Sequence, residues 1–233
     1  MTSSSRSPQR VRWPLQAGQE VETDLLGTLE GNAAPVLFLR GMDLAADWSF
    51  YPYLLEKLAE HRPVLVPVVP AGATLSAELA VVEALVAALA KARPGKVGLL
   101  GHAKGAALAL LVAERHASVG GVVGISTICT FNRGGEQALP GRSDVAQHGE
   151  RFQVELAARG TRCPVVLVHG EEDAIAPFAE GELVYHWLPK EHTSLVLLEK
   201  TGHSLGATNP FAGTNKELDR AVRITREFFA RVL

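Results

Sequence analysis

An acid, an imidazole and a glycine-flanked turn are the parts of this sequence that could do chemistry together. The turn is Gly-His-Ala-Lys-Gly at 101–105, the acid is Asp173, and the imidazole belongs to His203. Hydrolysis through a covalent intermediate uses a carboxylate to orient a histidine, and the histidine takes a proton from a nucleophile. The sequence offers an acid and a base of this kind, but Ala103, at the centre of the turn, carries no reactive atom.

The turn at 101–105 follows an apolar run that starts at Val97, and small apolar residues at helical density come after it. We therefore predict a strand, a tight turn and a helix, with residue 103 held in a strained conformation above the sheet. Glycine suits positions 101 and 105, because a Cβ atom there would clash where strand and helix come close. A plain strand-to-helix turn, with glycines that serve packing only, is the alternative.

Short apolar strands alternate with helices along the rest of the chain. Strands are predicted at 11–15, 21–29, 35–39, 63–69, 96–100, 119–126, 164–168 and 194–198. Helices are predicted at 48–60, 76–92, 104–116, 149–159, 178–188 and 218–233, the second of them started by Ser76. This alternation predicts an α/β fold: a mostly parallel central sheet of about eight strands with helices on both faces, and two early antiparallel strands at one edge.

The carboxyl ends of parallel strands are where ligand sites form in such sheets. Positions 103, 173 and 203 each follow a predicted strand. We therefore expect these three positions to share one site, on topological grounds alone.

Composition limits the classes of function. The formal net charge is −2 over 233 residues, which favours neither nucleic acid nor an anionic membrane as a partner. Cys129 and Cys163 form neither a disulfide framework nor a metal-ligand spacing, so we expect a reduced, cytoplasmic compartment. We expect no secretory leader and no membrane span, because no apolar run has the required length. No metal is expected, since the eight histidines are scattered, and no cofactor is expected, since no glycine-rich nucleotide motif follows the first parallel strand.

The domain organisation follows from the same length and pattern. Residues 1–9 are expected to be a flexible tail, and residues 10–233 a single domain. The irregular stretch 127–162 is too short for a large helical cap, so a small lid or an open cleft is expected there. Whether the chain is a monomer or a dimer stays open, although the exposed faces of the helices 76–92 and 218–233 could serve a dimer.

These motifs, in this order, resemble those of the α/β-hydrolase family, whose nucleophile elbow reads Gly-x-Ser-x-Gly. Ala103 stands where the family carries its serine. From about residue 35 onward, the chain looks closest to small dienelactone-hydrolase-like and prolyl-oligopeptidase-like serine hydrolases. The cues are the stretches 101–105, 126–133 and 202–213. The resemblance implies the α/β-hydrolase fold and hydrolysis of carboxylic esters or related acyl compounds by a Ser-Asp-His triad.

The resemblance also assigns roles to the acid and the base. Asp173 would hold the Nδ1–H of His203, and His203 would remove the proton of the nucleophile and return one to the leaving group. The two glutamates at 171–172 could compete for the acid's role, Asp173 could simply cap its loop, and His203 could be a surface histidine. His102 is expected to pack or hydrogen-bond beneath the elbow, and His169 to be a core or rim residue.

An oxyanion hole of two backbone N–H groups is implied as well. One would belong to Lys104, directly after the nucleophile position. The other would belong to Met42, in Arg-Gly-Met at 40–42, where the family often has His-Gly. The Lys104 side chain is expected to be solvated or at the edge of the pocket. Trp48 and Phe131 are expected either to line an acyl pocket or to belong to the core.

Two explanations of Ala103 remain open. In the first, the natural protein has serine there and this copy has been inactivated; intact Asp173 and His203 favour this explanation. In the second, the chain is a natural pseudoenzyme that binds an ester or acyl ligand without turnover. A peptidase or a thioesterase on the same machinery is a further alternative. In each case the expected partner is a small molecule.

Overall fold

The computed structural model describes residues 8–14, 20–41, 48–70, 72–93, 95–132, 145 and 148–233. The strands are Gln9–Pro14 (β1), Glu20–Leu26 (β2), Val36–Leu39 (β3), Val64–Pro67 (β4), Val97–His102 (β5), Val119–Ile125 (β6), Val165–Gly170 (β7) and Thr193–Leu198 (β8). The helices are Tyr51–Ala59 (α1), Leu75–Ala92 (α2), Lys104–Arg115 (α3), Val154–Gly160 (α4), Phe178–Trp187 (α5) and Lys216–Val232 (α6), with 3-10 turns at Gly149–Phe152 (η4) and Lys190–His192 (η5).

Within these residues, eight strands form one sheet in the order β1-β2-β4-β3-β5-β6-β7-β8. The pairs β1–β2 and β2–β4 are antiparallel. The pairs β4–β3, β3–β5, β5–β6, β6–β7 and β7–β8 are parallel. Every residue of β3, β4, β5, β6 and β7 is buried, as expected for parallel strands that are covered on both faces. The predicted mostly parallel sheet, with an antiparallel pair at one edge, is confirmed.

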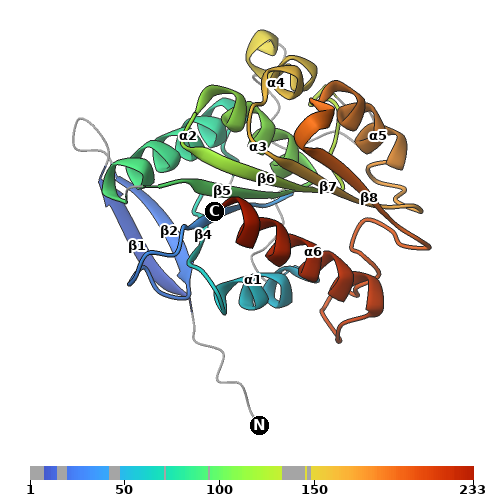
Figure 1. The fold of residues 1–233 in the computed structure, drawn as a ribbon, viewed down its shortest axis with the longest axis horizontal. Coiled ribbons are helices and arrows are strands. Elements are labelled where there is room, and N and C mark those ends of the chain that lie inside the picture. Colours follow the sequence, from blue (N-terminus) through green and yellow to red (C-terminus); the bar gives the residue numbers. More distant parts are fainter. Residues whose placement is uncertain are drawn as a thin grey trace.

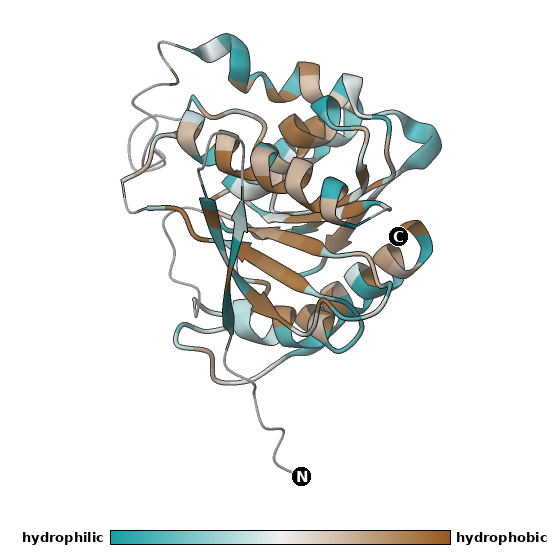
Figure 2. Cartoon of the chain, turned by 90° about the vertical axis from the view of Figure 1, so that its left-hand side faces the viewer, coloured by the Kyte–Doolittle hydropathy of each residue, from teal (hydrophilic) through white to brown (hydrophobic). Residues whose placement is uncertain are grey.

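Helices cover both faces of the sheet. Helices α2, α3, α4 and α5 lie on one face, and α1 and α6 lie on the other (Figure 1). The buried apolar side chains accordingly form two clusters, one under each helical layer. Figure 2 shows the apolar central strands between these layers and the hydrophilic edge pair β1–β2 in front. The sheet therefore has its core on both sides, and its carboxyl edge is left to form a site.

Two local predictions were wrong. Helix α2 is not started by Ser76: Thr74 is its N-cap, and the Thr74 hydroxyl accepts a hydrogen bond from the N–H of Ala77 at 3.2 Å. The helix predicted at 149–159 is split into η4 and α4, because the backbone at Gln153 is extended. The predicted lid at 127–162 falls partly on residues 133–144 and 146–147, which lie outside the described residues.

Candidate active site

The turn between β5 and α3 has the strained geometry that the sequence predicts. Ala103 has φ 49° and ψ −113°, in the left-handed region that costs a residue with a Cβ atom about 1–3 kcal/mol. Its N–H donates to the carbonyl of Ile125 at 2.8 Å, so β6 holds the strained residue in place. A Cβ atom on Gly101 would overlap the backbone of Gly105, and one on Gly105 would overlap the backbone oxygen of Leu39. Only glycine allows this close approach.

Asp173 and His203 form a buried hydrogen-bonded pair. His203 Nδ1 lies 2.9 Å from Oδ2 and 3.1 Å from Oδ1 of Asp173, and the Asp173 side chain is fully buried. The backbone N–H groups of Ile175 and Ala176 also donate to Oδ1, at 3.0 and 2.8 Å. Because a carboxylate only accepts hydrogen bonds, it fixes the proton of His203 on Nδ1 and leaves Nε2 as an acceptor.

The carboxyl group of Asp173 is ionised at neutral pH. Burial would raise its pKa, but the hydrogen bond from His203, the charge of His203 and the N–H of Ala176 outweigh burial and lower the pKa to about 2. The neighbouring glutamates are exposed, and Glu171 instead accepts a hydrogen bond from the N–H of Lys200 at 3.1 Å. Among the three acids of this loop, Asp173 is therefore the one positioned to orient His203.

Sheet topology brings positions 103, 173 and 203 to one edge. Ala103 follows β5, Asp173 follows β7 and His203 follows β8, and all three strands are parallel within one run of neighbours. The loops after β7 and β8 approach so closely that a Cβ atom on Gly170 would overlap the carbonyl of Thr201. The elbow is also in direct contact with the loop after β8 that carries His203, called the histidine loop below. His102 Nε2 lies 3.1 Å from the carbonyl oxygen of His203.

Two further histidines lie beneath this site, and both are buried as expected. His102 is fully buried between the elbow and the histidine loop, so its pKa is lowered well below the usual range, first by burial and then by the charge of His203. His169 lies in β7, where its Nε2 donates to the carbonyl of Ala176 at 2.7 Å. Burial also lowers the pKa of His169. Both rings are therefore neutral parts of the core, and His169 supports the loop that carries Asp173.

The Lys104 side chain was expected to be solvated or to lie at the edge of the pocket, and the first of these alternatives was wrong. Its Nζ lies 2.6 Å from Oε2 of Glu78, and the two side chains are only 5% and 13% exposed. The pair joins the first turn of α3 to the first turn of α2. The sequence shows both charges, but neither periodicity nor spacing indicates that α2 and α3 bring together two residues that are 26 apart along the chain.

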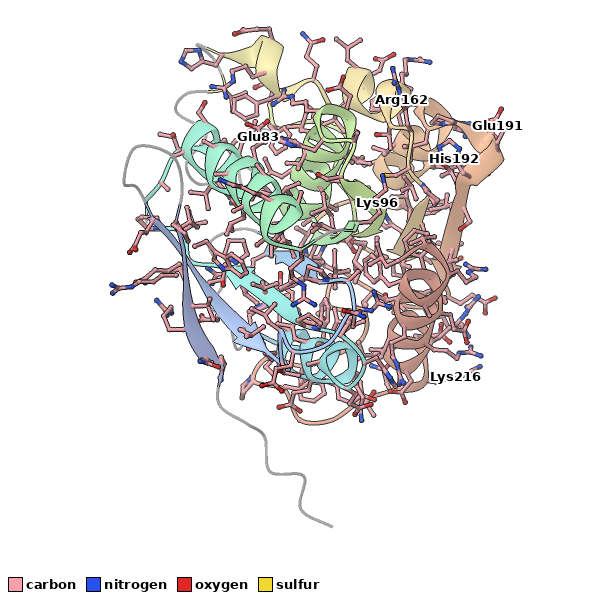
Figure 3. The ribbon with its side chains drawn as sticks, turned by 60° about the vertical axis from the view of Figure 1, so that its left-hand side comes forward. Glu83, Lys96, Arg162, Glu191, His192 and Lys216 are labelled. Atoms are coloured by element: carbon pink, nitrogen blue, oxygen red, sulfur yellow. The ribbon has the colours of Figure 1, made fainter. Side chains whose placement is uncertain are left out.

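Because this pair is buried, we expect two similar substitutions in α2 to differ in how much they destabilise the protein. Glu78→Gln leaves the charge of Lys104 buried beside a neutral group, so we expect the free energy of unfolding to fall by about 3 kcal/mol. The matched control is Glu83→Gln, because Glu83 (labelled in Figure 3) also joins α2 to α3, through Arg115, but with side chains 24% and 30% exposed. The control should cost less than about 1 kcal/mol. Urea unfolding of both variants measures the difference, and equal losses would contradict the prediction.

Of the remaining predicted site residues, Trp48 and Phe131 are described by the structure, and they lie in different layers of the core. Met42 lies outside the described residues, so the second oxyanion donor stays a prediction. Trp48 is half-buried and stacks on His102 in the cluster under α1 and α6, with ring centroids 5.6 Å apart. Phe131 is buried in the other cluster, packs against Phe152 and borders a cavity of about 760 Å³. Trp48 and Phe131 thus pack into opposite layers of the core.

The described residues contain no group of three or more His, Cys, Asp or Glu side chains that could hold a metal ion. In the same part of the chain, no helix combines the length and the apolar character that crossing a membrane requires. Cys163 is a thiol that forms no disulfide. Burial raises the pKa of the Cys163 thiol to about 11, which leaves it protonated and unreactive.

Comparison with known proteins identifies the fold. No family model matches the sequence, and no curated protein matches it. Among solved structures, the esterase domain of a Rhodothermus marinus protein aligns with 97% of this chain and 98% of its own, at a TM-score of 0.71 and 19% identity. Carboxyl esterase 2 from the fungus Tuber melanosporum aligns with 99% of this chain and 88% of its own, at a TM-score of 0.78 and 12% identity. A monoacylglycerol lipase from Paleococcus ferrophilus aligns with 92% of this chain and 100% of its own, at a TM-score of 0.73 and 14% identity.

These similarities show the fold of the chain. The chain has the α/β-hydrolase fold, and the structures named above are esterases and lipases built on it. At identities below 20% the likeness shows the fold, while the chemistry must be argued from the site. The finer resemblance to dienelactone-hydrolase-like and prolyl-oligopeptidase-like enzymes stays a prediction from the sequence.

Proposed function

We propose that this chain carries the machinery of a serine esterase and, with alanine at position 103, binds a carboxylic ester or related acyl compound without forming an acyl-enzyme. The observation that carries the proposal is the buried Asp173–His203 pair, in contact with a strained elbow. The esterases and lipases of the same fold support ester chemistry as the class of reaction.

In a chain with serine at position 103, the reaction would take two stages. The serine oxygen attacks the ester carbonyl while Nε2 of His203 takes its proton, and the tetrahedral oxyanion accepts hydrogen bonds from the N–H groups of Lys104 and Met42. The C–O bond to the leaving alcohol then breaks as His203 returns the proton to that oxygen. Water, deprotonated by His203, next attacks the acyl-enzyme, and the serine leaves with the proton.

Alanine removes the attacking oxygen from this sequence of steps but leaves the other groups unchanged. The remaining route is direct attack by water with His203 as the base, since sites that lack one member of a triad retain roughly 10³–10⁴-fold catalysis over water. The strained backbone at Ala103 favours the explanation in which a serine has been replaced, because an alanine gains nothing from a conformation that costs about 1–3 kcal/mol.

The absent nucleophile is also what favours the second candidate function. A pseudoenzyme of the same fold would bind an ester or acyl ligand above Ala103 and release it unchanged. A peptidase or a thioesterase would use the same acid, base and elbow, and would differ from an esterase in the shape of its pocket.

The experiment that tests the proposal is Ala103→Ser. We expect kcat/KM for short and medium p-nitrophenyl esters to rise about 10³-fold or more, and a fluorophosphonate probe to label position 103. The matched control is Ala117→Ser, which adds the same hydroxyl to an exposed position just after α3 and should give neither turnover nor label. A folded Ala103→Ser protein with neither signal would refute the esterase proposal. The pseudoenzyme would then lead, tested by ligand binding to the unchanged chain.

A further inference from the structure

Three segments of the proposed site meet at the buried side chain of His102. The N–H of Gly41, directly before Met42, donates to the hydroxyl oxygen of Tyr51 at 3.0 Å. That hydroxyl lies 2.8 Å from Nδ1 of His102, and Nε2 of His102 lies 3.1 Å from the carbonyl oxygen of His203. One chain of hydrogen bonds therefore connects the loop after β3, the elbow and the histidine loop.

The position of every proton in this chain follows from donor and acceptor chemistry. A carbonyl oxygen only accepts, so the proton of His102 must lie on Nε2, which donates to His203. Burial lowers the pKa of His102 and raises the pKa of Tyr51, so both side chains are neutral. Nδ1 of His102 is consequently an acceptor, and it receives the proton of the Tyr51 hydroxyl. The hydroxyl oxygen in turn accepts from Gly41.

The packing of side chains around His102 holds these hydrogen bonds in place. The His102 ring is stacked on Trp48 and meets Phe50 edge-on at 5.4 Å, and both Tyr51 and His102 are completely buried. A Cβ atom on Gly41 would lie only 2.8 Å from Nδ1 of His102, so glycine is required where the loop after β3 reaches the ring. Turning the ring over would break both of its hydrogen bonds.

We infer that Tyr51 and His102 are positioning residues of this site, which together hold the backbone of His203 and of Gly41 in register with the elbow. The expected effect on rate rests on the proposed function. The arrangement of protons is independent of that function, because it is a property of the protein with alanine at position 103. His102 holds His203 by two contacts: its Nε2 donates to the backbone carbonyl of His203, and the two imidazole rings pack with centroids 4.5 Å apart. Both contacts position His203, and neither takes up its Nδ1, which is bonded to Asp173.

Removal of the Tyr51 hydroxyl would act on His203 through the ring of His102. In Tyr51→Phe, Nδ1 of His102 and the N–H of Gly41 both lose their partner while remaining buried. His102 keeps its proton on Nε2, because a proton on Nδ1 would face a second donor, the N–H of Gly41, and would give up the bond to His203. Nδ1 and the N–H of Gly41 can then pair only if the ring shifts into the space left by the hydroxyl. Because Nε2 holds the carbonyl of His203, the histidine loop would shift with the ring.

NMR of protein labelled with ¹³C and ¹⁵N in its histidines tests the arrangement in the unchanged chain, because it reports both the imidazole nitrogens and the backbone carbonyls. We expect His102 to be in the Nε2–H form with Nδ1 unprotonated, and we expect Tyr51→Phe to shift the signals of both His102 and the His203 backbone carbonyl. The matched control is Tyr53→Phe on the same helix, because Tyr53 loses the same atom but donates to Asp219 at the surface. The control should leave both signals in place.

The rate effect is measured in the Ala103→Ser background. Tyr51→Phe should lower kcat about tenfold, the amount that about one hydrogen bond of positioning energy allows, with KM changed less than twofold. Tyr53→Phe should leave both constants unchanged. The inference is overturned if His102 is in the Nδ1–H form, or if Tyr51→Phe matches Tyr53→Phe in the NMR signals or in kcat. An inactive Ala103→Ser protein would refute the proposed function instead, and the NMR result would still decide the inference.

Discussion

Asp173→Asn, made in a chain that carries Ala103→Ser, is expected to lower kcat for p-nitrophenyl esters by about 10⁴-fold. The reason is the proton of His203. The N–H groups of Ile175 and Ala176 both donate to Oδ1 of Asp173, so they would hold the amide oxygen of an asparagine at that position. The amide nitrogen would then face Nδ1 of His203, where Oδ2 lies at 2.9 Å.

An amide nitrogen donates, so it would select the His203 form whose Nδ1 is bare and whose proton lies on Nε2. That form cannot accept a proton from serine. The matched control is Glu172→Gln, the same loss of charge at the exposed neighbouring residue, which should leave kcat within about twofold. Steady-state kinetics of both variants measure the contrast. A loss below tenfold in Asp173→Asn would mean that another group orients His203.

The same substitution has a second readout in acid stability. The pKa of Asp173 is lowered to about 2 in the folded chain, from an unfolded value near 4. The ionised carboxylate therefore stabilises the fold above about pH 4, and this contribution of about 2 kcal/mol is lost as the pH falls from about 4 to about 2. Asp173→Asn should lack that decline. Urea unfolding at pH 5 and at pH 3 measures the difference between the two chains.

The sequence predicts the central strands and the elbow because both depend on patterns of neighbouring residues. Continuous apolar runs mark β3 through β7, and each predicted boundary lies within two residues of the observed one. The elbow is predicted by its glycines, since only glycine can stand where a Cβ atom would overlap backbone. The order of acid and histidine along the chain, together with the rule that parallel strands present their carboxyl ends at one edge, brings Asp173 to His203.

The parts that could not be predicted are contacts between segments distant in the sequence. Lys104 and Glu78 meet because two helices pack at their first turns, which no periodicity encodes. Tyr51 reads as one more apolar position of a helix, and only the structure shows its hydroxyl between Gly41 and His102. The N-cap of α2 was misplaced because Thr74 and Ser76 are both good caps, and the fold decides which one begins the helix.

Gly105→Ala is expected to lower the free energy of unfolding by more than about 4 kcal/mol, a large part of the 5–15 kcal/mol of a typical domain. Gly105 lies in the first turn of α3, where glycine to alanine ordinarily stabilises a helix by about 1 kcal/mol. Here the new Cβ atom would overlap the carbonyl oxygen of Leu39 and lie 2.6 Å from that of Arg40. These are backbone atoms at the end of β3, so no change of rotamer relieves the overlap.

The sign of the Gly105→Ala effect therefore separates close packing from helix propensity. Gly149→Ala is the matched control, because a Cβ atom there meets nothing within 4 Å, and the variant should change stability by less than about 1 kcal/mol. Urea unfolding of both variants, or the yield of soluble protein where Gly105→Ala does not fold, measures the contrast. If Gly105→Ala were as stable as the unchanged chain, α3 would have to move away from β3 at little cost. The N–H of Lys104 would then not be held rigidly against the loop that follows β3, and the elbow would lose the fixed geometry on which an oxyanion hole depends.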